Sequence, residues 1–220
     1  LYDKLIESRM IADPDNHWLF ATIQRRKDNY SNSFNGPSLH IMVLTKRCNQ
    51  ACRYCHASSI DSESPEFDLN KEDAKKFVEI IMGSPNKNIT IEFQGGEPLL
   101  RFDLLRYVVE YANELNKKSK KDLRFSIVTN LELMDSLKLD YLVNHKVDIC
   151  TSLDGPAFLH DMNRPSLRCK SSHKVVEEWI NILNNKGIRI GALATISKES
   201  LRYPKEIIDE YIRLGFDHIH

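Results

Sequence analysis

The sequence predicts an α/β fold with a mainly parallel sheet, either open or closed into a barrel. From residue 39 onward, short apolar runs alternate with segments that have helical apolar spacing. Such alternation implies right-handed crossovers and parallel strand pairing. The 220 residues, 41% of them hydrophobic, can bury a substantial core. Because residues 1–38 are irregular in pattern, we expect them to form an N-terminal extension to one core domain at 39–220.

Five runs of mostly apolar residues are the predicted strands. Each run is short, contains β-branched residues and is bounded by polar or turn-forming residues. The runs are LHIMVLT (39–45), ITIEFQG (89–95), LRFSIVT (123–129), VDICTSL (147–153) and IRIGALATI (188–196). FDHIH (216–220) begins a sixth strand where the sequence ends, so a barrel truncated at strand six is one interpretation.

Helical spacing of apolar residues separates these strands. Ala74, Val78 and Ile81 lie on one face of a predicted helix that Gly83 ends. The segments 102–115, 173–187 and 204–214 show the same pattern, and 135–146 is a weaker candidate. Each predicted strand is therefore linked to the next by a segment long enough for a crossover.

Charge and cysteine usage narrow the class of protein. The 31 basic and 31 acidic residues give a formal net charge of zero, so there is no electrostatic reason to expect nucleic acid or an anionic membrane as partner. No apolar run is long enough to span a bilayer and no leader opens the chain, which favours a cytoplasmic protein without a membrane partner. Three of the 5 cysteines lie within eight residues, a spacing more typical of metal ligands than of disulfides.

Polar and small residues follow four successive predicted strands. Loops at the C-terminal ends of parallel strands form the ligand-binding face in both open sheets and barrels. The sequence therefore predicts a site at this edge. In chain order, its candidates are Cys48, Cys52, Cys55, Gly95, Gly96, Glu97, Thr129, Asn130, Ser152 and Asp154.

Three motifs at these strand ends resemble one enzyme superfamily. In TKRCNQACRYCH, the spacing Cys-x3-Cys-x2-Cys with Tyr54 before the third cysteine resembles the signature of radical S-adenosylmethionine (radical SAM) enzymes. FQGGEPLL resembles their Gly-Gly-Glu-Pro motif, and TSLDGPAFLHDMNRP resembles the branch of sulfatase maturases and peptide-modifying enzymes. Within that branch, GPSLHIMVLTKRCNQACRYC is most similar to the maturase of the His-Xaa-Ser peptide-modification system. The resemblance covers residues 39–220 and implies a partial (β/α)6 barrel.

The resemblance implies a cofactor pair. Thiolates of Cys48, Cys52 and Cys55 can bind three irons of a 4Fe-4S cluster and leave the fourth iron open. In the family, that iron takes the amino and carboxylate groups of S-adenosylmethionine. An electron from a donor such as flavodoxin or ferredoxin then cleaves the sulfonium, and the 5′-deoxyadenosyl radical abstracts hydrogen from a peptide or protein substrate.

Other residues are expected around S-adenosylmethionine. Gly95 and Gly96 allow close backbone approach, and the carboxylate of Glu97 can accept hydrogen bonds from the amino group. By resemblance, the neighbourhood of Tyr54 contacts the adenine, Ser152 contacts the ribose or carboxylate region, and Arg164 grips the carboxylate. Thr129 and Asn130 have the right position without an inferable contact. No catalytic acid or base is identified.

Several alternatives are open. The cysteines could hold a structural zinc with His56 or a distant residue as fourth ligand, and in a non-catalytic metal-binding module either zinc or a cluster would only stabilise the loop. Cys-Arg-Tyr-Cys-His also fits a c-type haem, but that interpretation fails because it leaves Cys48 unexplained and requires export for which no leader is visible. Asp154 in SLDGP could be a turn former. Cys150 is expected to be a buried thiol and Cys169 a free surface thiol.

Two expectations concern neighbouring regions. Enzymes of this branch commonly carry a C-terminal cysteine-rich domain with auxiliary clusters, and this sequence contains none. Either the chain is cut at strand six or it is a reduced form of the branch. Residues 1–38 are too short for a complete peptide-recognition domain, so we expect a separate protein to bind the leader of a peptide substrate.

Overall fold

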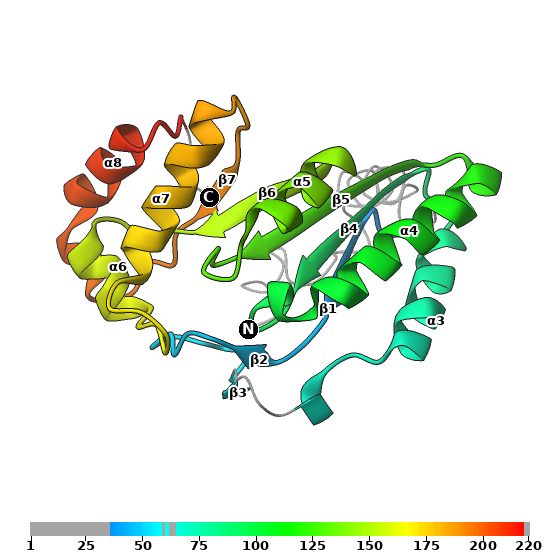
Figure 1. Ribbon diagram of the computed structural model, residues 1–220, viewed down its shortest axis with the longest axis horizontal. Helices are drawn as coiled ribbons and strands as arrows, with labels where there is room; N and C mark the ends of the chain where they lie inside the picture. Colours follow the sequence, from blue (N-terminus) through cyan, green and yellow to red (C-terminus); the bar gives the residue numbers. More distant parts are fainter. Residues whose placement is uncertain (1–35, 59, 62–64, 218–220) are drawn as a thin grey trace, which may run out of the picture.

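A parallel sheet of five strands forms the centre of the protein. The computed structural model describes residues 36–58, 60–61 and 65–217. The strands are arranged in the order β1-β4-β5-β6-β7 and every neighbouring pair is parallel (Figure 1). Their bounds are Leu39–Val43 (β1), Asn88–Gln94 (β4), Asp122–Thr129 (β5), Val147–Ser152 (β6) and Gly191–Leu193 (β7). The predicted α/β fold with a parallel sheet is confirmed.

Helices connect the strands at the predicted places. They are α3 (Lys71–Met82), α4 (Phe102–Ser119), α5 (Ser136–Asn144), α6 (Ala157–Asn163), α7 (Ser172–Asn185) and α8 (Pro204–Arg213). Three 3-10 turns, η2 (Pro65–Phe67), η3 (Pro98–Arg101) and η4 (Ser200–Arg202), and a small parallel pair, β2 (Arg47–Cys48) with β3 (Ile60–Asp61), complete the described elements. Of these helices, α6 was not predicted. None of the described helices is long and apolar enough to cross a membrane.

Polar side chains begin three of the helices. The side chain of Asn70 accepts a hydrogen bond from the backbone N–H of Asp73 at the start of α3. Asp135 and Ser171 cap α5 and α7 in the same way. Each cap satisfies a backbone donor that the first helical turn leaves without a partner.

The fifth strand is much shorter than predicted. The run 188–196 contains only the three residues of β7. At its start, the N–H of Ile188 donates to the carbonyl of Leu183 and so completes the end of α7. At its far end, the N–H of Thr195 donates to the side chain of Asp154. Backbone groups that cap a helix and bind a side chain are not available for the sheet.

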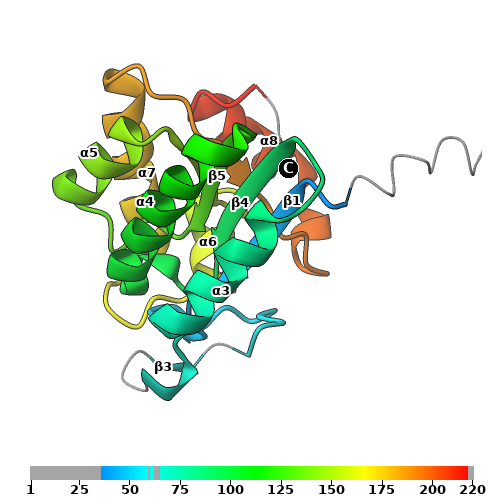
Figure 2. The same cartoon turned by 90° about the vertical axis from the view of Figure 1, so that its right-hand side faces the viewer.

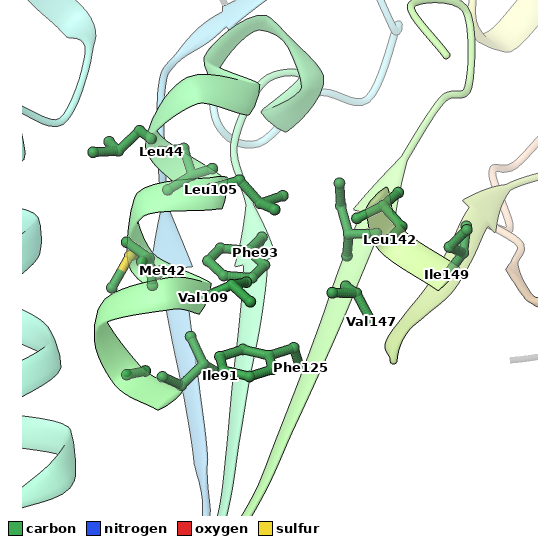
Figure 3. Packing of buried hydrophobic residues seen from close by; sticks show 14 of the residues in the cluster. Met42, Leu44, Ile91, Phe93, Leu105, Val109, Phe125, Leu142, Val147 and Ile149 are labelled. Carbon is green, nitrogen blue, oxygen red and sulfur yellow. The ribbon is translucent and has the colours of Figure 1, made fainter. Parts of the chain in front are cut away.

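The main core lies between the sheet and α3, α4 and α5 (Figure 2). Ile91 and Phe93 of β4 alternate with polar residues and face Leu105 and Val109 of α4 (Figure 3). The rings of Phe93 and Phe125 stack with centroids 6.2 Å apart across neighbouring strands. This packing fixes the register of the strands and hence the positions of their C-terminal ends.

A second, smaller core lies under α6, α7 and α8. Its buried residues are Leu153, Leu159, Val176, Ile180, Ala192, Ile207, Tyr211 and Leu214. The hydroxyl of Tyr211 donates to the carbonyl of Leu153 at 2.6 Å, which ties α8 to the end of β6. The loop after β6 is thereby held by packing from three helices.

The other face of the sheet is more polar. The pleat places Glu92 and Ser126 on the side opposite the main core, and their side chains are hydrogen-bonded at 3.3 Å. Cys150 lies on this face too and is half-buried, so the prediction of a buried thiol was wrong. The alternation of β6 turns Ile149 and Thr151, rather than Cys150, toward the helices.

Two predictions fall mainly outside the described residues. The structure does not describe residues 1–35, most of the predicted extension. It also does not describe residues 218–220 of the predicted sixth strand, and Phe216 and Asp217 before them are not in a strand.

Candidate active site

One cavity of about 310 Å³ opens at the C-terminal ends of the strands. A cavity of this size is at the lower end of the range for small-molecule sites. The residues that the sequence predicted as cluster or S-adenosylmethionine ligands line it, whereas the candidate Asp154 does not. These residues are Cys48, Cys52, Tyr54, Cys55, Gly95, Gly96, Glu97, Thr129, Asn130, Ser152 and Arg164. Segments more than 100 positions apart in the sequence therefore meet at a single site, as the strand-end argument predicted.

The cysteine loop is anchored on both sides. Before it, Asp68 accepts hydrogen bonds from the hydroxyl of Thr45 at 2.6 Å and from the Arg47 guanidinium at 2.6 and 2.8 Å. After Cys48, the N–H groups of Ala51 and Arg53 donate to backbone carbonyls of the segment that contains Arg164. These bonds place the loop across the end of the sheet.

The three thiols lie in a setting that suits metal ligation. Burial raises the pKa of Cys48 to about 12 and also raises the pKa of Cys52. Without a metal these groups hold their protons, and ligation to iron would replace the proton. Around Cys48 the backbone N–H of Gln50 donates to the sulfur at 3.4 Å. Cys55 closes a turn through its N–H to the carbonyl of Cys52.

The donor set fits an iron-sulfur cluster. Among the described residues, no three His, Cys, Asp or Glu side chains converge as ligands of a single metal ion. The three thiols instead stand on the wall of a shared cavity. Cys48, Cys52 and Cys55 are the residues that would hold a cluster whose remaining iron lacks a protein ligand.

The two glycines bring their loop against the cysteine loop. A Cβ on Gly95 would lie 2.5 Å from the carbonyl oxygen of Thr45, and one on Gly96 would lie 2.2 Å from that of Arg47. The N–H groups of Gly96 and Glu97 donate to these same two carbonyls at 2.8 Å. The two loops can therefore make contact only because residues 95 and 96 have no side chain. Close approach to a ligand, the role expected from the sequence, stays a prediction.

Glu97 is a buried carboxylate with an incomplete set of partners. It is 1% exposed. One oxygen accepts from the N–H of Leu99 and the hydroxyl of Thr129, and the other accepts from the N–H of Asn130. A carboxylate offers about four acceptor positions, so one remains on the second oxygen. Burial raises the pKa of Glu97 to about 7, against the opposing effect of these hydrogen bonds.

These bonds give Thr129 and Asn130 a contact that their sequence positions could not supply. Both orient the Glu97 carboxylate through the end of β5. The amide of Asn130 also donates to the side chain of Asn49 in the cysteine loop at 2.9 Å. The two residues therefore connect the Gly-Gly-Glu-Pro motif to the cysteine loop.

The positive charge of Arg164 is balanced by an ion pair with Asp154. The carboxylate of Asp154 is fully buried and accepts from the Arg164 Nε at 3.1 Å and from the N–H of Thr195 at 3.1 Å. The hydroxyl of Tyr54 also donates to it, and the Arg164 guanidinium lies over the Tyr54 ring, 5.2 Å from its centroid. Asp154 is thus part of the site's framework rather than only a turn former.

His160 contacts Asp154, and Ser152 lines this side of the cavity. The Nδ1 atom of His160 accepts a hydrogen bond from the N–H of Asp154, and burial lowers the pKa of His160 to about 4. Ser152 ends β6, and within the described part of the chain its hydroxyl has no hydrogen-bond partner. That hydroxyl is therefore available to a ligand in the cavity.

Sequence reasoning missed three residues at the site. Gln50 and Thr195 line the cavity. Glu132 lies outside it and accepts hydrogen bonds from Asn49 and Gln50 of the cysteine loop. The polar pair Asn49-Gln50 lies between two cysteines that are predicted metal ligands, and this position was a signal for Gln50. Nothing in the local sequence marked Glu132 or Thr195, because their roles arise from contacts distant in the chain. The prediction of an exposed thiol at Cys169 is confirmed.

Comparison with known proteins agrees with this geometry. A family model described as the radical SAM superfamily matches residues 42–211. The chain therefore belongs to the radical SAM superfamily. Members of this family use S-adenosylmethionine and a 4Fe-4S cluster.

Curated relatives include sulfatase-maturating enzymes and a cyclopropyl synthase. The chain is 29% identical to the serine-type anaerobic sulfatase-maturating enzyme of Bacteroides thetaiotaomicron, over 80% of this chain and 46% of that protein. It is 29% identical to the radical SAM cyclopropyl synthase TigE of Paramaledivibacter caminithermalis, over 76% of this chain and 37% of that protein. It is 28% identical to the uncharacterised protein MJ0907 of Methanocaldococcus jannaschii, over 80% and 58%. The chain thus spans only part of the length of these relatives.

Solved structures show the same fold. The anSMEcpe protein with bound AdoMet and the Kp18Cys peptide matches with a TM-score of 0.72 at 22% identity, over 82% of this chain and 49% of that one. Streptococcus suis SuiB bound to S-adenosylmethionine matches with a TM-score of 0.57 at 16% identity, over 99% and 50%. The fold implied by the sequence is therefore shared with these solved structures.

Proposed function

We propose that this protein is a radical SAM enzyme that modifies a peptide or protein substrate. When bound, the cluster and S-adenosylmethionine together supply a 5′-deoxyadenosyl radical that takes a hydrogen atom from the substrate. The protein's own contribution is to hold both groups in one cavity, orient them and limit access of water. The observation that carries the proposal is the convergence on that cavity of the three cysteines with the residues predicted to bind S-adenosylmethionine.

Each side of the cavity has a separate task. Cys48, Cys52 and Cys55 hold the cluster. The open acceptor position of Glu97 takes a hydrogen bond from the amino group of S-adenosylmethionine. Arg164, held rigid by Asp154 and Tyr54, presents its remaining N–H groups to the carboxylate. The hydroxyl of Ser152 supplies a donor and acceptor to the ribose or carboxylate region.

A peptide or protein substrate is supported by the relatives. Sulfatase-maturating enzymes are among them, and one solved relative is described with a bound peptide. Within this class we favour a peptide of the His-Xaa-Ser type, because the motifs around the cysteines and after β6 resemble that maturase. Oxidation of a cysteine or serine in a sulfatase is the second candidate, and the identity to the Bacteroides enzyme supports it. An electron donor such as flavodoxin or ferredoxin and a cytoplasmic location belong to the same proposal.

Production of 5′-deoxyadenosine tests the reaction class without the substrate. Protein reconstituted with iron and sulfide under anaerobic conditions would be reduced with dithionite and mixed with S-adenosylmethionine. We expect 5′-deoxyadenosine from the wild type and none from a variant with Cys48→Ala, Cys52→Ala and Cys55→Ala. Cys169→Ala is the matched control, because this exposed thiol lies outside the cavity and its loss should change nothing. A fully loaded wild type that makes no product would contradict the proposal.

Mass spectrometry then distinguishes the two candidate substrates. A His-Xaa-Ser repeat peptide and a sulfatase-derived peptide with a cysteine or serine would be incubated with the active protein. A mass change confined to the first supports the favoured substrate, and one confined to the second supports the sulfatase-maturase alternative.

A further inference from the structure

We propose that Glu132 is a positioning residue whose carboxylate holds the Gln50 turn of the cysteine loop and keeps the reduction potential of a cluster bound there low. This inference rests on the proposed function, since it concerns the cluster that the cysteines would hold. Glu132 is outside the cavity and matches none of the motifs found in the sequence. The inference comes from four features of its surroundings: its bonding partners, their link to the thiols, its backbone support and its charge.

Glu132 binds the cysteine loop and the Arg164 segment at once. One carboxylate oxygen accepts from the Gln50 amide at 2.6 Å. The other accepts from the Asn49 amide at 2.7 Å and from the Ser166 hydroxyl at 2.8 Å. These three donors come from two segments that also pair with each other, as in the bridge between Gln50 and Ser166. A single side chain from the end of β5 thus fixes both.

Gln50 connects Glu132 to two of the thiols. It is 3% exposed, and its backbone N–H donates to the sulfur of Cys48 at 3.4 Å. Its side-chain oxygen lies 3.7 Å from the sulfur of Cys52. Because the Gln50 amide nitrogen is held by Glu132, the orientation of the whole amide group is fixed. A displacement of the Glu132 carboxylate should therefore alter the surroundings of both thiols through Gln50.

A strained turn points Glu132 toward the loop. Leu131 has a φ of 61°, in the left-handed region that residues with a Cβ rarely adopt. The turn is held by hydrogen bonds from the N–H of Leu131 to the Thr129 hydroxyl and from the N–H of Glu132 to the Asn130 side chain. Strain of this kind persists where surrounding contacts over-determine the backbone, and it is found most often at functional sites.

The charge of Glu132 is not matched by a cation. Its three partners are amides and a hydroxyl, and no Lys, Arg or His nitrogen of the described residues forms an ion pair with it. The nearby Arg164 is engaged by Asp154 instead. A negative charge beside an iron-sulfur cluster opposes the arrival of an electron and lowers the reduction potential. A low potential gives the reduced cluster more driving force for the cleavage of S-adenosylmethionine.

A redox titration of the reconstituted cluster tests the inference. Glu132→Gln keeps the size of the side chain and removes the charge, so we expect the equilibrium constant for one-electron reduction to rise about tenfold, which corresponds to about 59 mV. Electron paramagnetic resonance during stepwise reduction would report the potential, and iron analysis would confirm equal loading. Glu132→Asp keeps the charge and should restore a potential close to that of the wild type. Glu114→Gln, an exposed site on α4, is the matched control and should leave the potential unchanged.

The outcomes separate this inference from the proposed function. An unchanged potential in fully loaded Glu132→Gln, or an equal rise in Glu132→Asp, overturns the role of the charge. If Glu132→Gln does not hold iron, Ser166→Ala carries the test, because loss of one donor leaves the charge less screened and should lower the potential. A potential in Ser166→Ala equal to or above that of the wild type also overturns it. A wild type that binds no cluster contradicts the proposed function itself.

Discussion

At the scale of single residues, the sequence located the site and the structure supplied its contacts. The position of Glu97 after a strand made it a site candidate, and the resemblance of its motif implied contact with the amino group of S-adenosylmethionine. Its three internal donors, including the hydroxyl of Thr129, depend on how two loops meet and could not be predicted locally. The result is a carboxylate with one free acceptor position in a buried setting.

The pH dependence of S-adenosylmethionine binding follows from this setting. The pKa of Glu97 is raised to about 7, so the free protein holds a proton there below that pH. In the folded state the proton is held more tightly than in the unfolded chain, and the stability this gives is lost as pH rises through about 7. Binding needs the carboxylate as acceptor. Affinity should therefore fall as pH drops below about 7, by up to roughly tenfold per pH unit.

Calorimetric titration of the reconstituted protein across this pH range checks the prediction. Glu97→Gln is the control, since it retains a side-chain acceptor and cannot titrate. The ligand's own ionisation affects both proteins equally, so the difference between their slopes belongs to Glu97. Identical slopes would show that Glu97 does not take part.

At the scale of elements, the contact between two strand-end loops organises the site. The loop after β4 lies directly on the backbone that leads to Cys48, and its glycines leave no space for a side chain. The strands and helices that carry these loops were predictable, because apolar periodicity is a local property. The helix α6 was missed because its seven residues are too few to show a period. The shortness of β7 depends on the end of α7, which directly precedes the run, and on Asp154, which lies 41 positions from Thr195 in the sequence.

Gly96→Ala should displace the cysteine loop. The added Cβ would lie 2.2 Å from the carbonyl oxygen of Arg47, so the two loops must separate. We expect the variant to lose most of its iron after reconstitution and to be destabilised by roughly 1–3 kcal/mol.

Gly187→Ala provides the comparison. Gly187 has a φ of 69° and open space around its Cβ position. The substitution should cost about 1–2 kcal/mol through backbone strain alone, with iron content unchanged. Iron analysis and chemical denaturation of both variants would separate the effects. Full iron loading in Gly96→Ala would refute a positional role for this contact.

At the scale of the whole molecule, the cavity lies between two hydrophobic cores. The cysteine loop, Glu97 and Asn130 are carried by elements of the main core, whereas Arg164 and Thr195 are carried by elements around the smaller one. Composition and periodicity predicted one core domain. They could not predict its division, because the division arises from which helices pack together.

Ligand binding should therefore stiffen the junction between the cores. β7 has only three residues, and Leu193 and Thr195 at its end line the cavity. A ligand that contacts both sides should slow amide hydrogen exchange in 191–195, since local opening of this short strand would break those contacts. Exchange measured by mass spectrometry with and without S-adenosylmethionine would show this. The middle of β5, buried between two strands, is the internal reference and should not change.

The pairing of Arg164 with Asp154 also bears on how ligands arrive. The guanidinium in the cavity has its charge balanced inside the protein, and the chain as a whole carries no formal net charge. Long-range attraction, which speeds encounters for proteins with unbalanced fields, is therefore weak for a zwitterionic or charged ligand. Capture then depends on short-range fit and hydrogen bonds formed after contact. The rate of association should consequently be almost insensitive to ionic strength.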